Sequence, residues 1–162
     1  MEPLAERVRP NHLDHYIGQE HIIGKESALR KAIEQNLLPS IILWGPPGVG
    51  KTTLGKQLST QLDIPFVELD NLFWLEKWQG RSKSEFQDIV GAYASTESWI
   101  MDGNYESVRH IIWSEADTLI WLDYSFGVIF YRLVKRILLR AISKEVVCGN
   151  NIDNGWVHLK LW

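Results

Sequence analysis

Short apolar runs alternate with amphipathic stretches along this 162-residue chain. Runs of this length and continuity predict buried strands, and they occupy residues 40–44, 65–69, 99–101 and 118–122. The intervening or flanking stretches with helical spacing of apolar residues are 25–36, 52–62, 84–94 and 125–143. Short strands that alternate with helices predict an α/β fold, in which a mostly parallel sheet carries helices on both faces.

The first predicted strand runs directly into a phosphate-binding motif. The run Gly45-Pro46-Pro47-Gly48-Val49-Gly50-Lys51-Thr52, followed by Thr53, matches the Walker A pattern between a strand and a helix. Glycines let successive backbone N–H groups surround an anion, and the helix that starts at Lys51 adds its positive dipole end. Lys51 should reach the β- and γ-phosphates and Thr52 should ligate Mg²⁺. The motif therefore predicts a P-loop NTPase fold that binds ATP and Mg²⁺.

Aspartates follow the other predicted strands, at Asp70, Asp102 and Asp123. The carboxyl ends of strands are where sites lie in parallel sheets. Asp102 is the predicted catalytic carboxylate and Mg²⁺ ligand, and the alternative is a turn aspartate before Gly103. Asp70 is predicted to face an acceptor substrate as a base or hydroxyl anchor, and the alternative is a helix N-cap.

The predicted helix at 125–143 has a basic side. Arg132, Arg136 and Arg140 recur at intervals of four, which places them on one face. We predict that Arg132 and Arg136 neutralise charge on a transferred phosphoryl group, with Arg109 as a weaker candidate for the acceptor phosphate. The alternative is a solvated basic face. An apolar face would comprise Phe126, Ile129, Phe130, Leu133, Ile137 and Leu138.

Composition restricts the partners and the compartment. The net charge of −3 gives no overall attraction for nucleic acid. No apolar run is long enough to span a membrane, so no membrane partner is expected. Cys148 is the single cysteine, which fits a reducing compartment and predicts a cytoplasmic protein.

Residues 4–53 resemble the clamp-loader-like AAA+ ATPases, in particular the replication-associated recombination ATPases related to the Holliday-junction helicase motor. The matching runs are Leu4-Ala5-Glu6-Arg7-Val8-Arg9-Pro10, Leu13-Asp14, Ile17-Gly18-Gln19-Glu20-His21 and Leu43-Trp44-Gly45-Pro46-Pro47-Gly48. In that family the Arg-Pro and Ile-Gly-Gln elements flank the adenine. The resemblance implies a base pocket formed by Val8, Arg9, Ile17 and Gly18.

Beyond Thr53 the chain looks like a different family. No Asp-Glu pair, which an AAA+ core uses to hold Mg²⁺ and activate water, occurs in the sequence. Residues 54–154 resemble the adenylate-kinase-like DNA topology modulation proteins. The matching runs are Leu69-Asp70-Asn71-Leu72-Phe73-Trp74, Trp99-Ile100-Met101-Asp102-Gly103-Asn104-Tyr105, Ala116-Asp117-Thr118-Leu119-Ile120-Trp121-Leu122-Asp123 and Cys148-Gly149-Asn150. The position after the last run, where that family has Arg, holds Asn151.

The two resemblances predict a chimera-like organisation. Residues 1–39 would be an AAA+-like leader, and residues 40–162 a kinase-like core that is incomplete at its C-terminal end. The expected function is Mg²⁺-dependent phosphoryl transfer from ATP to a small nucleotide-like or phosphorylated acceptor. One alternative is AAA+ ATP hydrolysis in DNA recombination or repair, with DNA as a partner only in that case. Another is a catalytically inactive nucleotide-binding module or fusion product.

Overall fold

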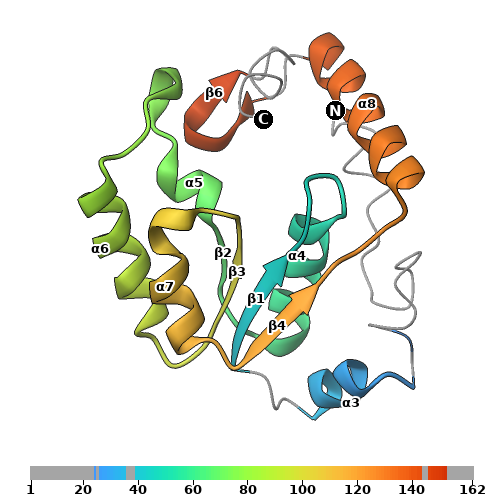
Figure 1. Cartoon of the computed structure of the whole chain (residues 1–162), viewed down its shortest axis with the longest axis vertical. Coiled ribbons are helices and arrows are strands. Elements are labelled where there is room, and N and C mark those ends of the chain that lie inside the picture. Colours follow the sequence, from blue (N-terminus) through green and yellow to red (C-terminus); the bar gives the residue numbers. More distant parts are fainter. Residues whose placement is uncertain (1–23, 25, 36–38, 144–145, 153–162) are drawn as a thin grey trace.

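Four parallel strands form the central sheet, in the order β2-β3-β1-β4. The computed structural model describes residues 24, 26–35, 39–143 and 146–152 (Figure 1). The side chains of residues 28, 136–143, 146, 147, 150 and 152 lie outside that description. The strands of the sheet are β1 (Ser40–Trp44), β2 (Phe66–Glu68), β3 (Trp99–Asp102) and β4 (Thr118–Trp121).

Helices connect the strands. The α-helices are α3 (Ala28–Glu34), α4 (Lys51–Leu62), α5 (Leu69–Phe73), α6 (Lys83–Ala94), α7 (Glu106–Glu115) and α8 (Phe126–Ser143). The short 3-10 turn η2 (Glu76–Trp78) follows α5. An antiparallel hairpin of β5 (Val146–Val147) and β6 (Asn151–Ile152) comes after α8, with η3 (Cys148–Asn150) at its turn. No helix of the described residues is long and apolar enough to cross a membrane.

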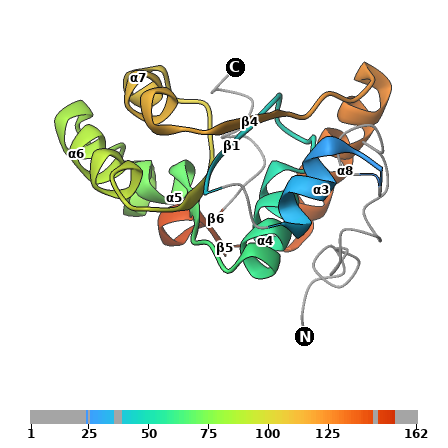
Figure 2. The same ribbon diagram turned by 90° about the horizontal axis from the view of Figure 1, so that it is seen from below.

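The sheet separates two apolar cores. Because successive side chains of a strand point to opposite faces, Ile41 and Leu43 pack with α3 and α4, whereas Ile42 packs with α6 and α7. In β3, Ile100 joins the first core and Met101 the second. Figure 2 shows α4 and α3 on one side of the sheet and α6 and α7 on the other. The predicted α/β architecture with helices on both faces is confirmed, and its continuous apolar strands reflect burial on both sides.

The register of the strands brings their carboxyl ends together. Asp102, the last residue of β3, is paired with Leu43 of β1 on one side and with Glu68 of β2 on the other. β3 is the direct neighbour of β1, the strand that leads into the Walker loop (residues 45–52). Asp102 therefore lies beside that loop.

A side-chain cap starts one helix, and the predicted position of Asp70 needs correction. Ser82 caps α6 through a capping box with Glu85, in which each side chain bonds the backbone N–H of the other residue. Asp70 does not end a strand, because β2 stops at Glu68 and Asp70 occupies the first turn of α5. The sequence pattern predicted neither α7 nor the hairpin.

Candidate nucleotide-binding site

Three glycines shape the Walker loop. Gly45, Gly48 and Gly50 have φ angles of 143°, 89° and 86°, which L side chains rarely adopt. A Cβ atom on Gly45 would also collide with the carbonyl oxygen of Leu122. Glycine at these positions lets the loop backbone curve in front of α4. The first N–H groups of that helix have no intrahelical partner. The Val49 side chain is buried in the core, so any contact of Val49 with phosphate has to come from its backbone.

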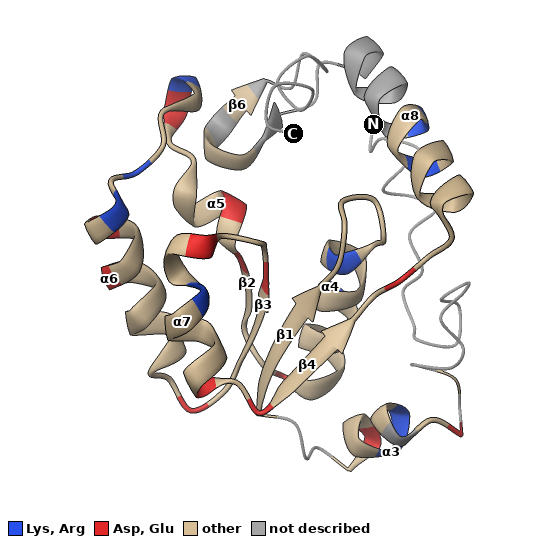
Figure 3. Cartoon of the chain, viewed as in Figure 1, with Lys and Arg blue, Asp and Glu red and all other residues tan. Residues whose placement is uncertain are grey.

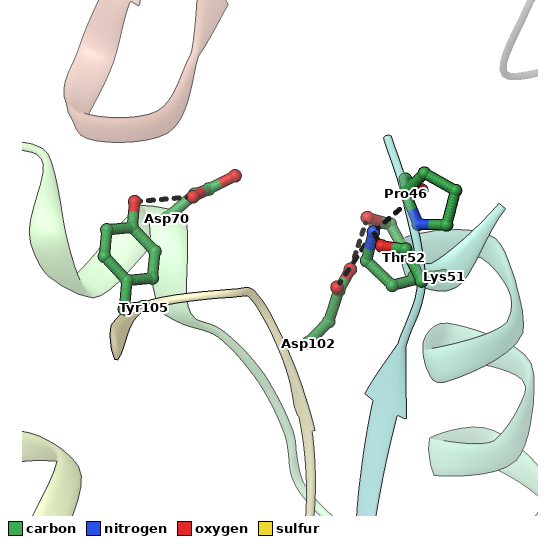
Figure 4. A network of polar contacts seen from close by, with 7 residues as sticks. Pro46, Lys51, Thr52, Asp70, Asp102 and Tyr105 are labelled. Carbon is green, nitrogen blue, oxygen red and sulfur yellow. Dashed lines mark hydrogen bonds and ion pairs between the residues drawn. The ribbon is translucent and has the colours of Figure 1, made fainter. Parts of the chain in front are cut away.

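Lys51 folds back over the loop. Its ammonium donates hydrogen bonds to the carbonyl oxygens of Gly45 and Pro46, at 2.9 and 3.2 Å (Figure 4). The same nitrogen lies 4.0 Å from Oδ1 of Asp102. The ammonium is thus held at the mouth of the loop, where phosphate oxygens of a nucleotide would replace the carbonyl partners.

Thr52 and Asp102 form the polar contact between α4 and β3. The Thr52 hydroxyl donates a hydrogen bond of 2.9 Å to Oδ2 of Asp102. Asp102 is only 8% exposed, and this burial raises the pKa of its carboxyl to about 6, although Lys51 and the Thr52 hydrogen bond lower it. Asp70 and Glu68 add a smaller upward effect on the same pKa. The site therefore holds a carboxyl group that a cation would drive into its ionised form.

The donor atoms of this pair suit Mg²⁺. That ion prefers oxygen ligands and usually keeps several waters, so it is bound through one or two protein groups plus substrate phosphates. The hydroxyl of Thr52 and the carboxylate of Asp102 provide such a pair. Among the described residues, no group of three or more His, Cys, Asp or Glu side chains gathers into a separate metal site.

Asp70 and Tyr105 form a second polar pair across from the first. The Tyr105 hydroxyl donates a hydrogen bond of 2.6 Å to Oδ1 of Asp70, and Figure 4 shows this pair facing the Lys51–Asp102 group. Burial and the negative charge of Asp70 raise the pKa of Tyr105 far above its ordinary value, so its hydroxyl stays a donor. The ring of Tyr105 packs against Phe73 and Phe86, with centroids at 4.9 and 5.1 Å. Sequence reasoning predicted Asp70 but missed Tyr105.

Arg109 does not join either pair. Its guanidinium lies over the ring of Trp44, 5.3 Å from the centroid, and its Nη2 is 3.4 Å from Oδ1 of Asn104. Its Nε is buried without a hydrogen-bond partner in the described structure. The predicted contact of Arg109 with an acceptor phosphate stays a prediction.

Helix α8 buries only part of its predicted apolar face. Phe126 and Phe130, which belong to that face, are 80% and 56% exposed and stack on each other. Ile129, from the same predicted face, packs against the core. Arg132, three residues later, lies over the ring of Tyr124 at 4.5 Å. The side chains of Arg136 and Arg140 lie outside the described residues.

The hairpin is attached to the segment after α5 by Asn151. Its buried amide accepts a hydrogen bond from the backbone N–H of Trp78 and donates to the carbonyl oxygens of Leu75 and Cys148. The asparagine that departs from the family pattern is therefore a structural anchor here.

Figure 3 shows acidic residues on α5 and at the start of α7, and a basic residue at the start of α4. The predicted base-pocket residues Val8, Arg9, Ile17 and Gly18 lie outside the described part of the chain.

Two family patterns match parts of the chain. Residues 41–120 match the ATPase family associated with various cellular activities (AAA), and residues 8–70 match the Holliday junction DNA helicase RuvB P-loop domain. The replication-associated recombination protein A of Coxiella burnetii is 56% identical over 54 residues, which are 33% of this chain and 12% of that protein. Its counterpart from Escherichia coli is 52% identical over 58 residues, or 36% of this chain and 13% of that protein. The chain thus spans about an eighth of the length of these relatives.

The solved structures agree on the fold. The Thermotoga maritima RuvB P216G mutant matches 95% of this chain and 73% of its own chain, with 18% identity and a TM-score of 0.50. The sequence matches support similarity to AAA+ recombination ATPases, and the AAA match continues well past Thr53, where the sequence pattern was expected to end. These findings favour the AAA+ alternative over a kinase-like function. The resemblance of residues 54–154 to adenylate-kinase-like proteins, and the chimera that it implies, stay predictions.

Proposed function

We propose that this protein binds ATP with Mg²⁺ at the Walker loop and cleaves the bond to the γ-phosphate, with water as the acceptor. The observation that carries the proposal is that Lys51, Thr52 and Asp102 come together at the carboxyl ends of the inner strands. A cation for the phosphates, a hydroxyl and a carboxylate are the groups that P-loop chemistry needs there.

Each group has a defined task. Backbone N–H groups of residues 45–52 and the start of α4 bind the phosphates, and Lys51 adds a positive charge near the scissile bond. Thr52 and Asp102 would hold Mg²⁺, which supplies charge neutralisation on the phosphate oxygens when it is bound. Catalysis at such a site depends on positioning and electrostatic stabilisation.

The similarity to AAA and RuvB sequences supports hydrolysis and a role in DNA recombination or repair. The matched relatives are named for recombination and for Holliday junctions, so DNA is the proposed macromolecular partner. The matching leader contains Val8, Arg9, Ile17 and Gly18, which we retain as the proposed adenine pocket.

A second function, phosphoryl transfer to a small acceptor, is favoured by one specific observation. Asp70, held by Tyr105, faces the Lys51–Asp102 group from the far side of the site, where an acceptor hydroxyl would have to lie. The residue after Asp102 is Gly103, and no acidic residue is available at that position to activate water. In this alternative, Asp70 orients the acceptor and Arg132 and Arg136 neutralise the transferred group.

Radiolabelled ATP distinguishes the two functions. ATP labelled at the γ-phosphate is incubated with the whole chain and Mg²⁺, with and without branched DNA, and then with a panel of nucleoside monophosphates and small hydroxyl compounds. Release of labelled phosphate that Lys51→Ala abolishes supports hydrolysis. Label on an acceptor, lost in Asp70→Asn and Tyr105→Phe, supports transfer. ATP binding with neither product overturns both functions and leaves an inactive nucleotide-binding module.

A further inference from the structure

Helix α8 meets the Walker loop through one face. A Cβ atom built on Gly48 would lie 3.6 Å from the carbonyl oxygen of Ile129 and 3.9 Å from its Cγ2. Ile129 also packs against the core formed by β1 and α4. The first turns of α8 therefore rest on the phosphate-binding loop, while Phe126 and Phe130 are exposed.

Arg132 lies on the same side of α8 as Ile129. Residues three apart are neighbours on a helix surface, and Arg132 is partly buried like Ile129, so the two share the side of α8 that turns toward the core. The guanidinium is stacked over the ring of Tyr124, with its central carbon 4.5 Å from the ring centroid. Tyr124 is itself packed against the core that contains β1 and α4. The ring is thus a fixed platform in the segment between β4 and α8.

We infer that Tyr124 is a positioning residue that holds the Arg132 guanidinium ready for the γ-phosphate of a bound nucleotide. The inference rests on the proposed function, because it concerns the same phosphate. It identifies a residue outside the Walker loop on which the rate of γ-phosphate cleavage depends.

Stacking suits this task because of the geometry of guanidinium. The group is planar, and a cation–π contact uses its face. Its N–H donors lie in the plane and point outward, so they stay available for a two-point contact with phosphate oxygens. Ordering the long side chain in advance also removes part of the entropy that would otherwise be lost when Arg132 engages the phosphate.

The rate of γ-phosphate cleavage should depend on the Tyr124–Arg132 contact more strongly than ATP affinity does. Negative charge redistributes over the γ-phosphoryl group and the leaving oxygen as the bond breaks, and a fixed cation stabilises that state more than the ground state. Loss of the platform therefore lowers kcat, whereas the phosphates remain bound by the Walker loop and Lys51.

The chain supplies a matched control on the outer side of the same helix. Lys135 lies 6.0 Å from the ring centroid of Tyr131, which is a second tyrosine–cation pair, and Tyr131 is exposed. Replacing Tyr131 changes an aromatic ring next to a cation without touching the side of α8 that meets the Walker loop.

The test compares Tyr124→Leu, Tyr124→Phe and Tyr131→Leu in steady-state phosphate release, with ATP affinity measured by calorimetry and folding by circular dichroism. Tyr124→Leu should lower kcat about tenfold and change ATP affinity less than twofold. Tyr124→Phe, which keeps the ring, should retain most of kcat, and Tyr131→Leu should match the unmodified chain.

A double-mutant cycle with Arg132→Ala decides the mechanism. If Tyr124 acts through Arg132, Tyr124→Leu has no further effect in the Arg132→Ala background. Losses that multiply instead, or a Tyr124→Phe variant as slow as Tyr124→Leu, overturn the inference while the proposed function stands. If the unmodified chain releases no phosphate, the proposed function fails and the inference fails with it.

Discussion

The hydroxyl of Thr52 donates a 2.9 Å hydrogen bond to Oδ2 of Asp102, although the two residues are 50 positions apart in the chain. The contact exists because β3 lies directly beside β1, so that the last residue of β3 meets the first turn of α4. It joins the Walker motif, the clearest signal in the sequence, to the carboxylate of Asp102, which lies outside that motif. The electrostatic properties of the site depend on this pair.

Removing the charge of Asp102 should strongly slow γ-phosphate cleavage and leave the fold unchanged. Asp102→Asn keeps the size of the side chain and an oxygen that can accept from Thr52, but loses the negative charge that would hold Mg²⁺. We expect γ-phosphate cleavage to fall by about two orders of magnitude or more. Circular dichroism should show an unchanged spectrum. A variant with full Mg²⁺-dependent activity would exclude Asp102 from the metal site.

The same substitution should remove a pH dependence of stability. In the folded chain burial raises the pKa of Asp102 from 3.8 to about 6. Between these values the folded state binds the proton and the unfolded state does not, so the free energy of unfolding falls as the pH rises. The difference of about two units corresponds to roughly 3 kcal/mol at most.

Urea unfolding in Mg²⁺-free buffer from pH 4 to pH 7 checks this sign. The stability of the unmodified chain relative to Asp102→Asn should decrease as the pH rises through this window. Both proteins contain all other titrating groups, so their difference isolates Asp102. A difference that stays constant, or increases with pH, would contradict the assignment of a raised pKa.

Lys51 should govern nucleotide affinity. Lys51→Ala removes the cation next to the β- and γ-phosphates, and ATP affinity should fall about tenfold or more, which is roughly 1.4 kcal/mol. Lys56→Ala is the matched control, because Lys56 is on the same helix, half-exposed, and lies 4.0 Å from Glu68 rather than in the loop. Calorimetry that found equal losses in the two variants would point to a general charge effect.

The fold was largely predictable because its determinants are local. Continuous apolar runs produce strands buried on both faces, and the Walker motif has one backbone solution that requires glycine at defined positions. Helix α7 was missed because few of its residues are buried, with Val108 and Ile112 as its buried positions. Asp70 was assigned to a strand end because the pattern of β2 continues into Leu69, whose side chain stays buried as the first residue of α5.

The site was less predictable because it depends on contacts between distant segments. Sequence alone identifies Asp70 but cannot reveal that Tyr105, 35 positions later, donates to it. It predicts two faces for the helix at 125–143, yet it cannot say which of them meets the Walker loop. The exposed Phe126 and inward Ile129 follow from how the segment after β4 leads into the helix, which is a tertiary property.

Replacing either of two helical glycines with alanine should change the free energy of unfolding, but in opposite directions. A Cβ atom on Gly55 of α4 would overlap the ring of Phe66, whereas one on Gly91 of α6 would meet no atom within 4 Å. Gly55→Ala should therefore destabilise the chain by about 1–3 kcal/mol through overpacking. Gly91→Ala should stabilise it by roughly 0.5–1 kcal/mol through helix propensity. A urea midpoint of Gly55→Ala that did not fall would show that the α4–β2 packing is looser than described.

The anchoring role of Asn151 predicts a change in the reactivity of Cys148. Asn151→Ala leaves the backbone N–H of Trp78 and the carbonyl oxygen of Leu75 without their partner, and each of these partly buried hydrogen bonds contributes about 1 kcal/mol. The hairpin should then open far more often, while the two cores around the sheet remain intact.

Cys148 lies in the turn of this hairpin, is partly buried, and is the single thiol of the chain. Its rate of labelling by a disulfide reagent therefore reports on the hairpin alone. We expect that rate to rise about tenfold or more in Asn151→Ala, with the urea midpoint of the sheet little changed. Asn71→Ala, at an exposed position of α5, should label at the rate of the unmodified chain. Equal labelling of all three proteins would mean that the hairpin is attached by other contacts than the Asn151 amide.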